Sequence, residues 1–69
     1  MTAIPELIAL GSRIRDLRTS HNLTQQELAL RAGIASNQIA RIERGERNPS
    51  YLTLLKVAKG LGIPMSELV

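Results

Sequence analysis

The chain has 69 residues, of which 43% are hydrophobic and 22% charged, and nine lysines and arginines outnumber six acidic residues to give a net charge of +3. A chain of this length buries one modest core, so we expect a single domain over residues 1–69. The absence of cysteine excludes disulfides and thiolate metal sites, and without an apolar run near the roughly 20 residues of a membrane span we expect a cytoplasmic protein.

A first helix is predicted over residues 5–20, because apolar residues recur there three and four apart. Leu7, Leu10, Ile14 and Leu17 share one face, and Pro5 suits the first turn of the helix. Strand-like alternation with a period of two is absent throughout the chain. The sequence therefore predicts an all-α protein of helices joined by short turns.

The second helix has the clearest start signal. Thr24 and Glu27 have the spacing of a capping box, and Gly33 can adopt the left-handed conformation that ends a helix after residue 32. A third helix is then expected over residues 36–44, with Gly45 ending it in the same way. Only about three residues separate these two helices.

A fourth and a fifth helix complete the predicted fold. Residues 46–50 form a polar turn, and Ser50 is a natural N-cap for a helix that Gly62 ends. Pro64 suits the first turn of a short last helix that carries Met65 and Leu68. We therefore expect a compact five-helix domain.

Residues 25–44 have the pattern that a helix-turn-helix requires. Two helices that cross at a tight turn need apolar residues on their facing sides, a small residue where they approach most closely, and glycine at the corner. Ala29 and Gly33 meet the last two demands. The polar residues of the second helix of the pair then face outward, and they are Ser36, Asn37, Gln38 and Arg41.

Several runs of sequence together resemble the Cro/repressor family of helix-turn-helix proteins. They are Leu23-Thr24-Gln25-Gln26-Glu27-Leu28-Ala29, Gly33-Ile34, Ile42-Glu43-Arg44-Gly45 and Asn48-Pro49-Ser50. The resemblance covers nearly the whole chain and implies a five-helix domain that binds double-stranded operator DNA as a transcriptional regulator. The turn at residues 47–50 is also similar to that of restriction-modification controller proteins, while phage repressors and antitoxin components stay open.

The resemblance implies a role for individual residues. In this family the start of the recognition helix reaches base edges, which predicts base contacts by Ser36 and Asn37, with Gln38 beside them and Arg41 one turn further along. It also implies a structural ion pair between Arg18 and Glu43. The residues expected to contact DNA phosphates are Gln25, Arg44, Arg47, Asn48, Ser50 and Tyr51.

Two residues depart from the pattern that these assignments require. Relatives often have serine or threonine where Ala35 stands, so Ser36 could cap the recognition helix instead, and its hydroxyl would then be unavailable to a base. Glu46 carries a negative charge next to Arg47, and phosphate would repel it unless its side chain pointed away.

Small domains without disulfides often gain stability by dimerising, so we expect a homodimer on a roughly palindromic operator, with recognition helices about 34 Å apart. Its predicted interface is Ile63, Met65 and Leu68. We expect no enzymatic activity, cofactor, metal, membrane contact or small-molecule substrate, because one histidine and scattered acids supply no catalytic set. The alternative is an antitoxin-like or protein-interaction module with the same fold.

Overall fold

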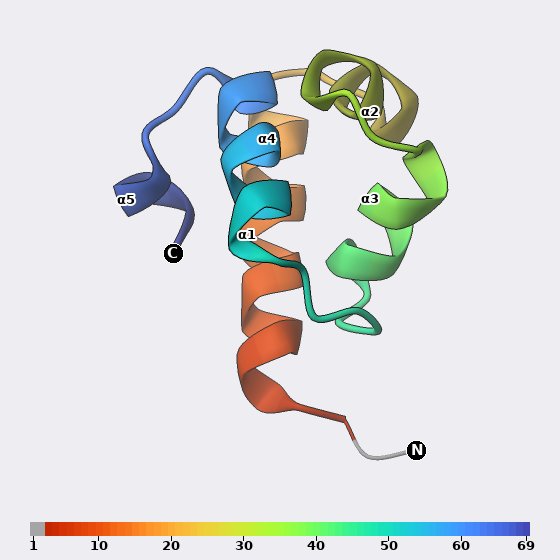
Figure 1. Cartoon of the computed structure of the whole chain (residues 1–69), viewed down its shortest axis with the longest axis vertical. Coiled ribbons are helices and arrows are strands. Elements are labelled where there is room, and N and C mark those ends of the chain that lie inside the picture. The colour runs from red at the N-terminus through yellow and green to blue at the C-terminus, as the bar shows by residue number, and fades with distance from the viewer. Residues whose placement is uncertain (1–2) are drawn as a thin grey trace.

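The computed structural model describes residues 3–69, and within them it contains five α-helices and no strand (Figure 1). The all-α, five-helix prediction is confirmed. None of the helices formed by these residues is both long and apolar enough to cross a membrane. The helices are α1 (Pro5–Ser20), α2 (Gln25–Ala32), α3 (Ser36–Glu43), α4 (Tyr51–Leu61) and α5 (Met65–Leu68).

The start and the end of α2 follow directly from local chemistry. The backbone N–H of Glu27 donates to Thr24 Oγ1 at 3.0 Å, and the N–H of Thr24 donates back to Glu27 Oε1 at 2.8 Å, which completes the predicted capping box. Gly33 ends the helix with φ of 75°. The chain can then reverse within three residues, because glycine adopts this left-handed conformation without a Cβ clash.

The later boundaries differ from the prediction by one residue at most. α3 ends at Glu43 rather than at Arg44, which is its C-cap, and Gly45 then turns the chain with φ of 74°. Ser50 caps α4 by accepting a hydrogen bond from the N–H of Thr53 at 3.1 Å. Pro64, predicted to lie in the first turn of the last helix, is its N-cap, and α5 begins at Met65.

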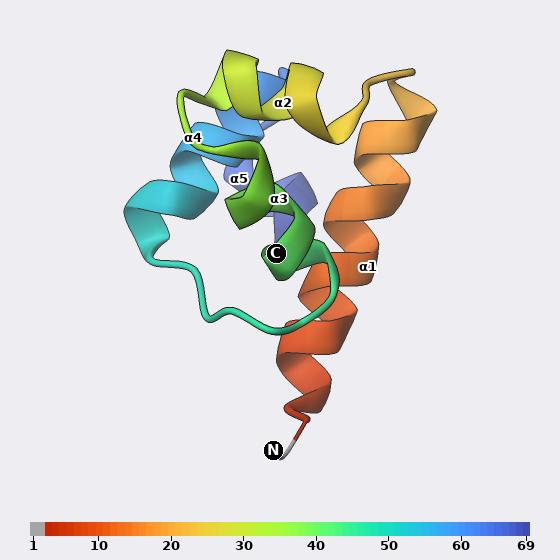
Figure 2. The same cartoon turned by 90° about the vertical axis from the view of Figure 1, so that its right-hand side faces the viewer.

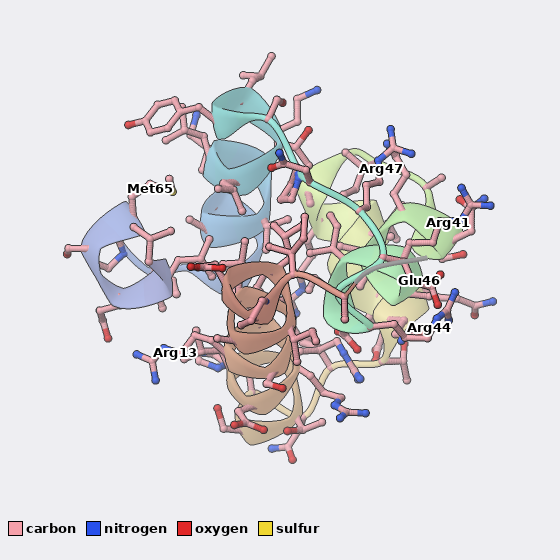
Figure 3. The ribbon with its side chains drawn as sticks, turned by 90° about the horizontal axis from the view of Figure 1, so that it is seen from below. Arg13, Arg41, Arg44, Glu46, Arg47 and Met65 are labelled. Carbon is pink, nitrogen blue, oxygen red and sulfur yellow. The ribbon has the colours of Figure 1, made fainter. Side chains whose placement is uncertain are left out.

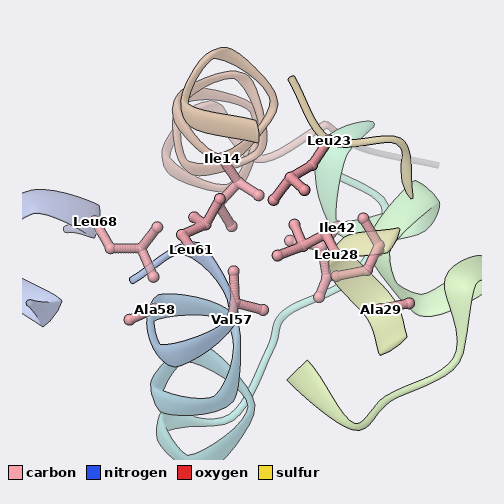
Figure 4. Packing of buried hydrophobic residues seen from close by; sticks show 10 residues of the cluster. Ile14, Leu23, Leu28, Ala29, Ile42, Val57, Ala58, Leu61 and Leu68 are labelled. Carbon is pink, nitrogen blue, oxygen red and sulfur yellow. The ribbon is translucent and has the colours of Figure 1, made fainter. Parts of the chain in front are cut away.

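The core is aliphatic and draws on all five helices (Figure 4). α2 lies across the top of the molecule, and α3 turns down from it beside α1 (Figure 2). This crossed arrangement buries the facing sides of both helices and leaves the other side of α3 exposed. The buried apolar residues are Ile14, Leu23, Leu28, Ala29, Ala32, Ile39, Ile42, Val57, Ala58, Leu61 and Leu68.

Leu68 does not fit its predicted place in a dimer interface, because its side chain is 2% exposed and lies in the core of its own subunit. It points from α5 toward α4 (Figure 4). Arg13 of α1 holds α5 in place by donating two hydrogen bonds, of 3.0 and 2.8 Å, to the carbonyl oxygen of Glu67. Ile63 and Met65 also pack against the core but stay half-buried, so they retain some surface for a partner.

α1 and α3 approach each other closely at Gly11, which the sequence analysis did not single out. A Cβ at this position would overlap the backbone of α3, since it would lie 2.6 Å from the carbonyl oxygen of Glu43 and closer still to that of Ile42. Glycine therefore sets the distance between α1 and α3, and with it the position of the exposed face of α3.

Candidate nucleic-acid interface

α3 has one buried face and one polar, solvent-exposed face. Ile39, Ile42 and Glu43 are buried against the rest of the domain. Ser36, Asn37 and Arg41 are exposed, as the helical spacing predicted, and Gln38 is half-buried. The structure therefore places Ser36, Asn37 and Gln38 in the first turn of α3 and Arg41 in its last turn.

Arg41 on this face and two arginines that follow α3 add positive charge. Arg41, Arg44 and Arg47 gather on the side of the molecule that lies away from α5 and Met65 (Figure 3). All three side chains are exposed. A cluster of exposed guanidinium groups attracts the phosphates of nucleic acid and holds them by charge-assisted hydrogen bonds.

The N-terminus of α3 is capped by Gln38 and not by Ser36. The N-cap residue is Ala35, whose N–H donates to Gln38 Oε1 at 3.1 Å, three residues ahead. Ser36 is already the first residue of the helix, and its hydroxyl makes no hydrogen bond to any of residues 3–69. The side chain of Ser36 is thus left for solvent or a ligand, whereas Gln38 is partly committed to the protein.

Glu43, the last residue of α3, lies at the centre of a hydrogen-bond network on the buried side of this helix. Its side chain accepts two hydrogen bonds from Arg18, of 2.6 and 3.1 Å, and one from Gln25 Nε2 at 3.0 Å. Arg18 also donates to the carbonyl oxygen of Leu23 at 2.8 Å. The bond to Glu43 is the main reason that the pKa of Arg18 is raised. This network ties α1, the start of α2 and the end of α3 together.

The bond between Gln25 and Glu43 could not be predicted from the sequence pattern. The spacing between them gives no local signal, because 18 residues separate them along the chain. One amide hydrogen of Gln25 is engaged by Glu43, and the half-buried side chain keeps a second donor and its carbonyl oxygen. Gln25 can therefore contact a phosphate only in an orientation that Glu43 already sets.

Arg44 is paired with Glu46 on the exposed loop after α3. Arg44 Nε donates to Glu46 Oε2 at 2.8 Å, and a second bond of 3.1 Å joins the same two side chains. The hydrogen bond from Arg44 lowers the pKa of Glu46, and the charges of Arg44 and Arg41 lower it further. The carboxylate thus lies within the basic cluster, where it offsets part of the positive charge.

The remaining predicted phosphate contacts lie around the start of α4. Arg47, Asn48 and Tyr51 are exposed. The hydroxyl of Ser50 accepts from the N–H of Thr53 and lies 3.0 Å from the hydroxyl of Thr53, so its side chain already acts in capping. At this end of α4 a ligand would meet exposed side chains and the positive end of a helix dipole.

Comparison with known proteins places this geometry in a family. Residues 14–68 match the family described as Helix-turn-helix. A helix-turn-helix-type transcriptional regulator from Sinorhizobium fredii is 40% identical over 60 residues, which cover 87% of this chain and 78% of that protein. The cryptic phage CTXphi transcriptional repressor RstR from Vibrio cholerae is 41% identical over 59 residues, which cover 86% of this chain but only 53% of the repressor.

A solved structure agrees over almost the full length. The restriction-modification controller protein C.AhdI from Aeromonas hydrophila superposes with a TM-score of 0.94 at 38% identity, over 96% of this chain and 100% of that one. The family match spans most of the residues that form the five helices. The chain therefore belongs to the helix-turn-helix family of transcriptional regulators.

Proposed function

We propose that the protein binds double-stranded DNA sequence-specifically and regulates transcription, with α3 in the major groove. The observation that carries this proposal is the exposed polar face of α3, held on a rigid base by the buried Glu43 network. Ser36, Asn37, Gln38 and Arg41 are within one and a half turns of each other on α3, which is the length of helix that enters a groove.

Base and phosphate contacts are divided between α3 and its surroundings. Asn37 can bond adenine through both of its amide groups, and Arg41 can donate two bonds to guanine O6 and N7. The proposed phosphate contacts orient the domain without reading sequence, and they come from Gln25, Arg44, Arg47, Asn48, Ser50 and Tyr51. Their support is their exposure or their position at a helix N-terminus beside the basic cluster.

We also propose that a cytoplasmic homodimer binds a roughly palindromic operator, with recognition helices about one helical turn of DNA apart. Ile63, just before α5, and Met65, its first residue, are half-buried and are the interface residues that this proposal retains. Both a phage repressor and a restriction-modification controller protein are among the relatives. We favour the controller-like role, because the whole of C.AhdI matches 96% of this chain.

Selection of duplexes from a random library with purified protein tests the proposal directly. We expect enrichment of one half-site in two copies related by a two-fold axis. The logarithm of the affinity should also fall steeply with the logarithm of the salt concentration, since phosphate binding releases counterions. A protein that enriched no sequence and showed no salt dependence would instead fit a protein-docking module.

A further inference from the structure

We propose that Arg13 is a positioning residue for dimerisation: it holds α5 on α1, and the docked α5 places Met65 in the interface with a second copy of the chain. The inference rests on the proposed homodimer and deepens it, because it assigns a role to a residue outside the predicted interface. The sequence pattern gives no sign of this role, since 54 residues separate Arg13 from its partner Glu67.

The short helix α5 cannot maintain its conformation alone. It has only four residues, and a single helical turn in water gains too few hydrogen bonds to offset the entropy lost in ordering it. Its backbone supplies a bond of 3.1 Å from the N–H of Val69 to the carbonyl oxygen of Met65, and the N–H of Glu67 donates to the carbonyl oxygen of Pro64 at 3.0 Å. Contacts with α1 and α4 must therefore supply the rest of its stability.

Two side chains anchor α5 to the domain. Leu68 inserts into the core, where it is 2% exposed. Arg13 donates from Nε and from a terminal nitrogen of the same guanidinium group to the carbonyl oxygen of Glu67. Among residues 3–69, these two are the only hydrogen bonds between α5 and another helix. A carbonyl group in the last turn of a helix has no partner within the helix, and a cation at that end is electrostatically favourable.

The segment that Arg13 anchors also carries the proposed interface. Met65 is the first residue of α5, two positions before Glu67, and it is half-buried against the core. Arg13 and Met65 lie on the side of the molecule away from Arg41 and Arg44, so Arg13 acts far from the recognition face (Figure 3). If α5 loosens, Met65 moves with it, and the surface offered to a second copy is no longer preformed. Association then has to order that surface as well, which lowers the affinity.

Two-fold symmetry multiplies the effect of a loosened α5. A homodimer uses the same surface twice, so α5 must be docked in both subunits when they associate. The apparent affinity of a surface falls in proportion to the population of its binding-competent state. If loss of the Arg13 bonds leaves α5 docked about a third of the time, the factor of about three enters once for each subunit, and the dimer dissociation constant rises roughly tenfold.

Arg13→Gln tests the proposal, with Arg15→Gln as the matched control, because Arg15 is exposed on the same helix and loses the same charge. Sedimentation equilibrium measures the dimer dissociation constant. Hydrogen exchange followed by mass spectrometry, on protein diluted below that constant, reports whether α5 is docked in the monomer.

We expect Arg13→Gln to raise the dissociation constant roughly tenfold and to speed exchange at residues 66–69, while Arg15→Gln changes neither. Arg13→Lys keeps a cationic donor and should restore part of the affinity. Because α3 is untouched, Arg13→Gln should select the same half-site as wild type from a random library, but at a higher protein concentration. A general loosening of the fold would not leave that selection intact.

Three results would overturn the inference. An unchanged dissociation constant would show that Leu68 alone keeps α5 docked. A weaker dimer in which α5 exchanges as slowly as in wild type would show that Arg13 touches the partner directly, and equal weakening by Arg15→Gln would show an effect of net charge. If the wild type sedimented as a monomer at every concentration, the proposed homodimer itself would fail, whereas DNA binding would be judged separately by the half-site that the monomer selects.

Discussion

Arg18 on α1 and Glu43 on α3 are joined by two hydrogen bonds, of 2.6 and 3.1 Å, beneath the exposed face of the recognition helix. Their side chains are 12% and 2% exposed, so the pair is shielded from water and salt. Gln25 donates a third bond to the same carboxylate from the start of α2. The orientation of α3 is therefore fixed by charge as well as by apolar packing.

Glu43→Gln should destabilise the fold by about 3 kcal/mol, because it leaves the charge of Arg18 poorly compensated in a nearly buried place. In a domain of this size, such a loss lowers the melting temperature by more than about 10 °C. Thermal and urea unfolding measure it. Arg44→Gln, which breaks the exposed pair with Glu46, is the control and should leave the melting temperature almost unchanged. Equal effects of the two variants would contradict a special role for the buried pair.

Gly11→Ala should destabilise the protein by about 1–3 kcal/mol and move α3 relative to α1, because the added methyl group overlaps the backbone of α3. Urea unfolding and backbone amide chemical shifts along α3 report the two effects. Gly33→Ala is the comparison, since a Cβ there meets nothing within 4 Å and costs only the left-handed strain. Chemical-shift changes confined to α1 would argue against a close approach of Gly11 to the backbone of α3.

Arg41→Ala should relax preference at one operator base pair by about 1–3 kcal/mol, because it removes a proposed two-bond contact with guanine. Arg47→Ala should weaken binding to all sequences about equally and lower the salt slope by about one unit. Binding profiles over a randomised operator library distinguish these effects. Identical profiles for the two variants would show that the proposed division between base and phosphate contacts is wrong.

Glu46→Gln should strengthen DNA binding, because it releases Arg44 and removes a carboxylate from the basic cluster. The slope of log affinity against log salt concentration should steepen by up to the equivalent of about one additional phosphate contact. Fluorescence anisotropy at several salt concentrations measures both quantities. Glu6→Gln makes the same change in net charge beside α5, where Glu6 and Glu67 line one groove. If both variants gained equally, net charge alone would explain the effect.

Glu27 should contribute to stability in a pH-dependent way. The pKa of Glu27 in the folded state is lowered mainly by the hydrogen bond from the backbone N–H of Thr24, and further by one with the hydroxyl of Thr24. The contribution of its charge is therefore complete above the ordinary carboxyl pKa, and it is lost as the pH falls through the lowered value. Glutamine resembles the protonated form of Glu27. The unfolding free energy of the Glu27→Gln variant should therefore be lower than that of wild type near neutral pH, and the two values should converge in acid. A constant gap at every pH would disprove this linkage.

The local sequence determined the ends of the helices. Thr24 with Glu27, Ser50 and the glycines at 33, 45 and 62 act within a few residues of themselves, so the capping bonds and chain reversals could be predicted from spacing. The outward face of α3 could also be predicted, because helical periodicity separates polar from apolar positions. α3 ends one residue before the predicted boundary, because the last residue of a helix depends on which partners its final backbone groups find.

What only the tertiary structure decided depends on contacts between distant parts of the chain. The bond from Gln25 to Glu43 and the close approach at Gly11 each join segments at least 18 residues apart, and no local pattern encodes such a contact. The packing of Leu68 likewise depends on how α5 folds back onto α4 and α1. The capping bond of Gln38 is local, yet only coordinates show which way its amide group is turned. Sequence therefore determined which side chains line the recognition face, and three-dimensional packing decided which of their donors and acceptors are left for DNA.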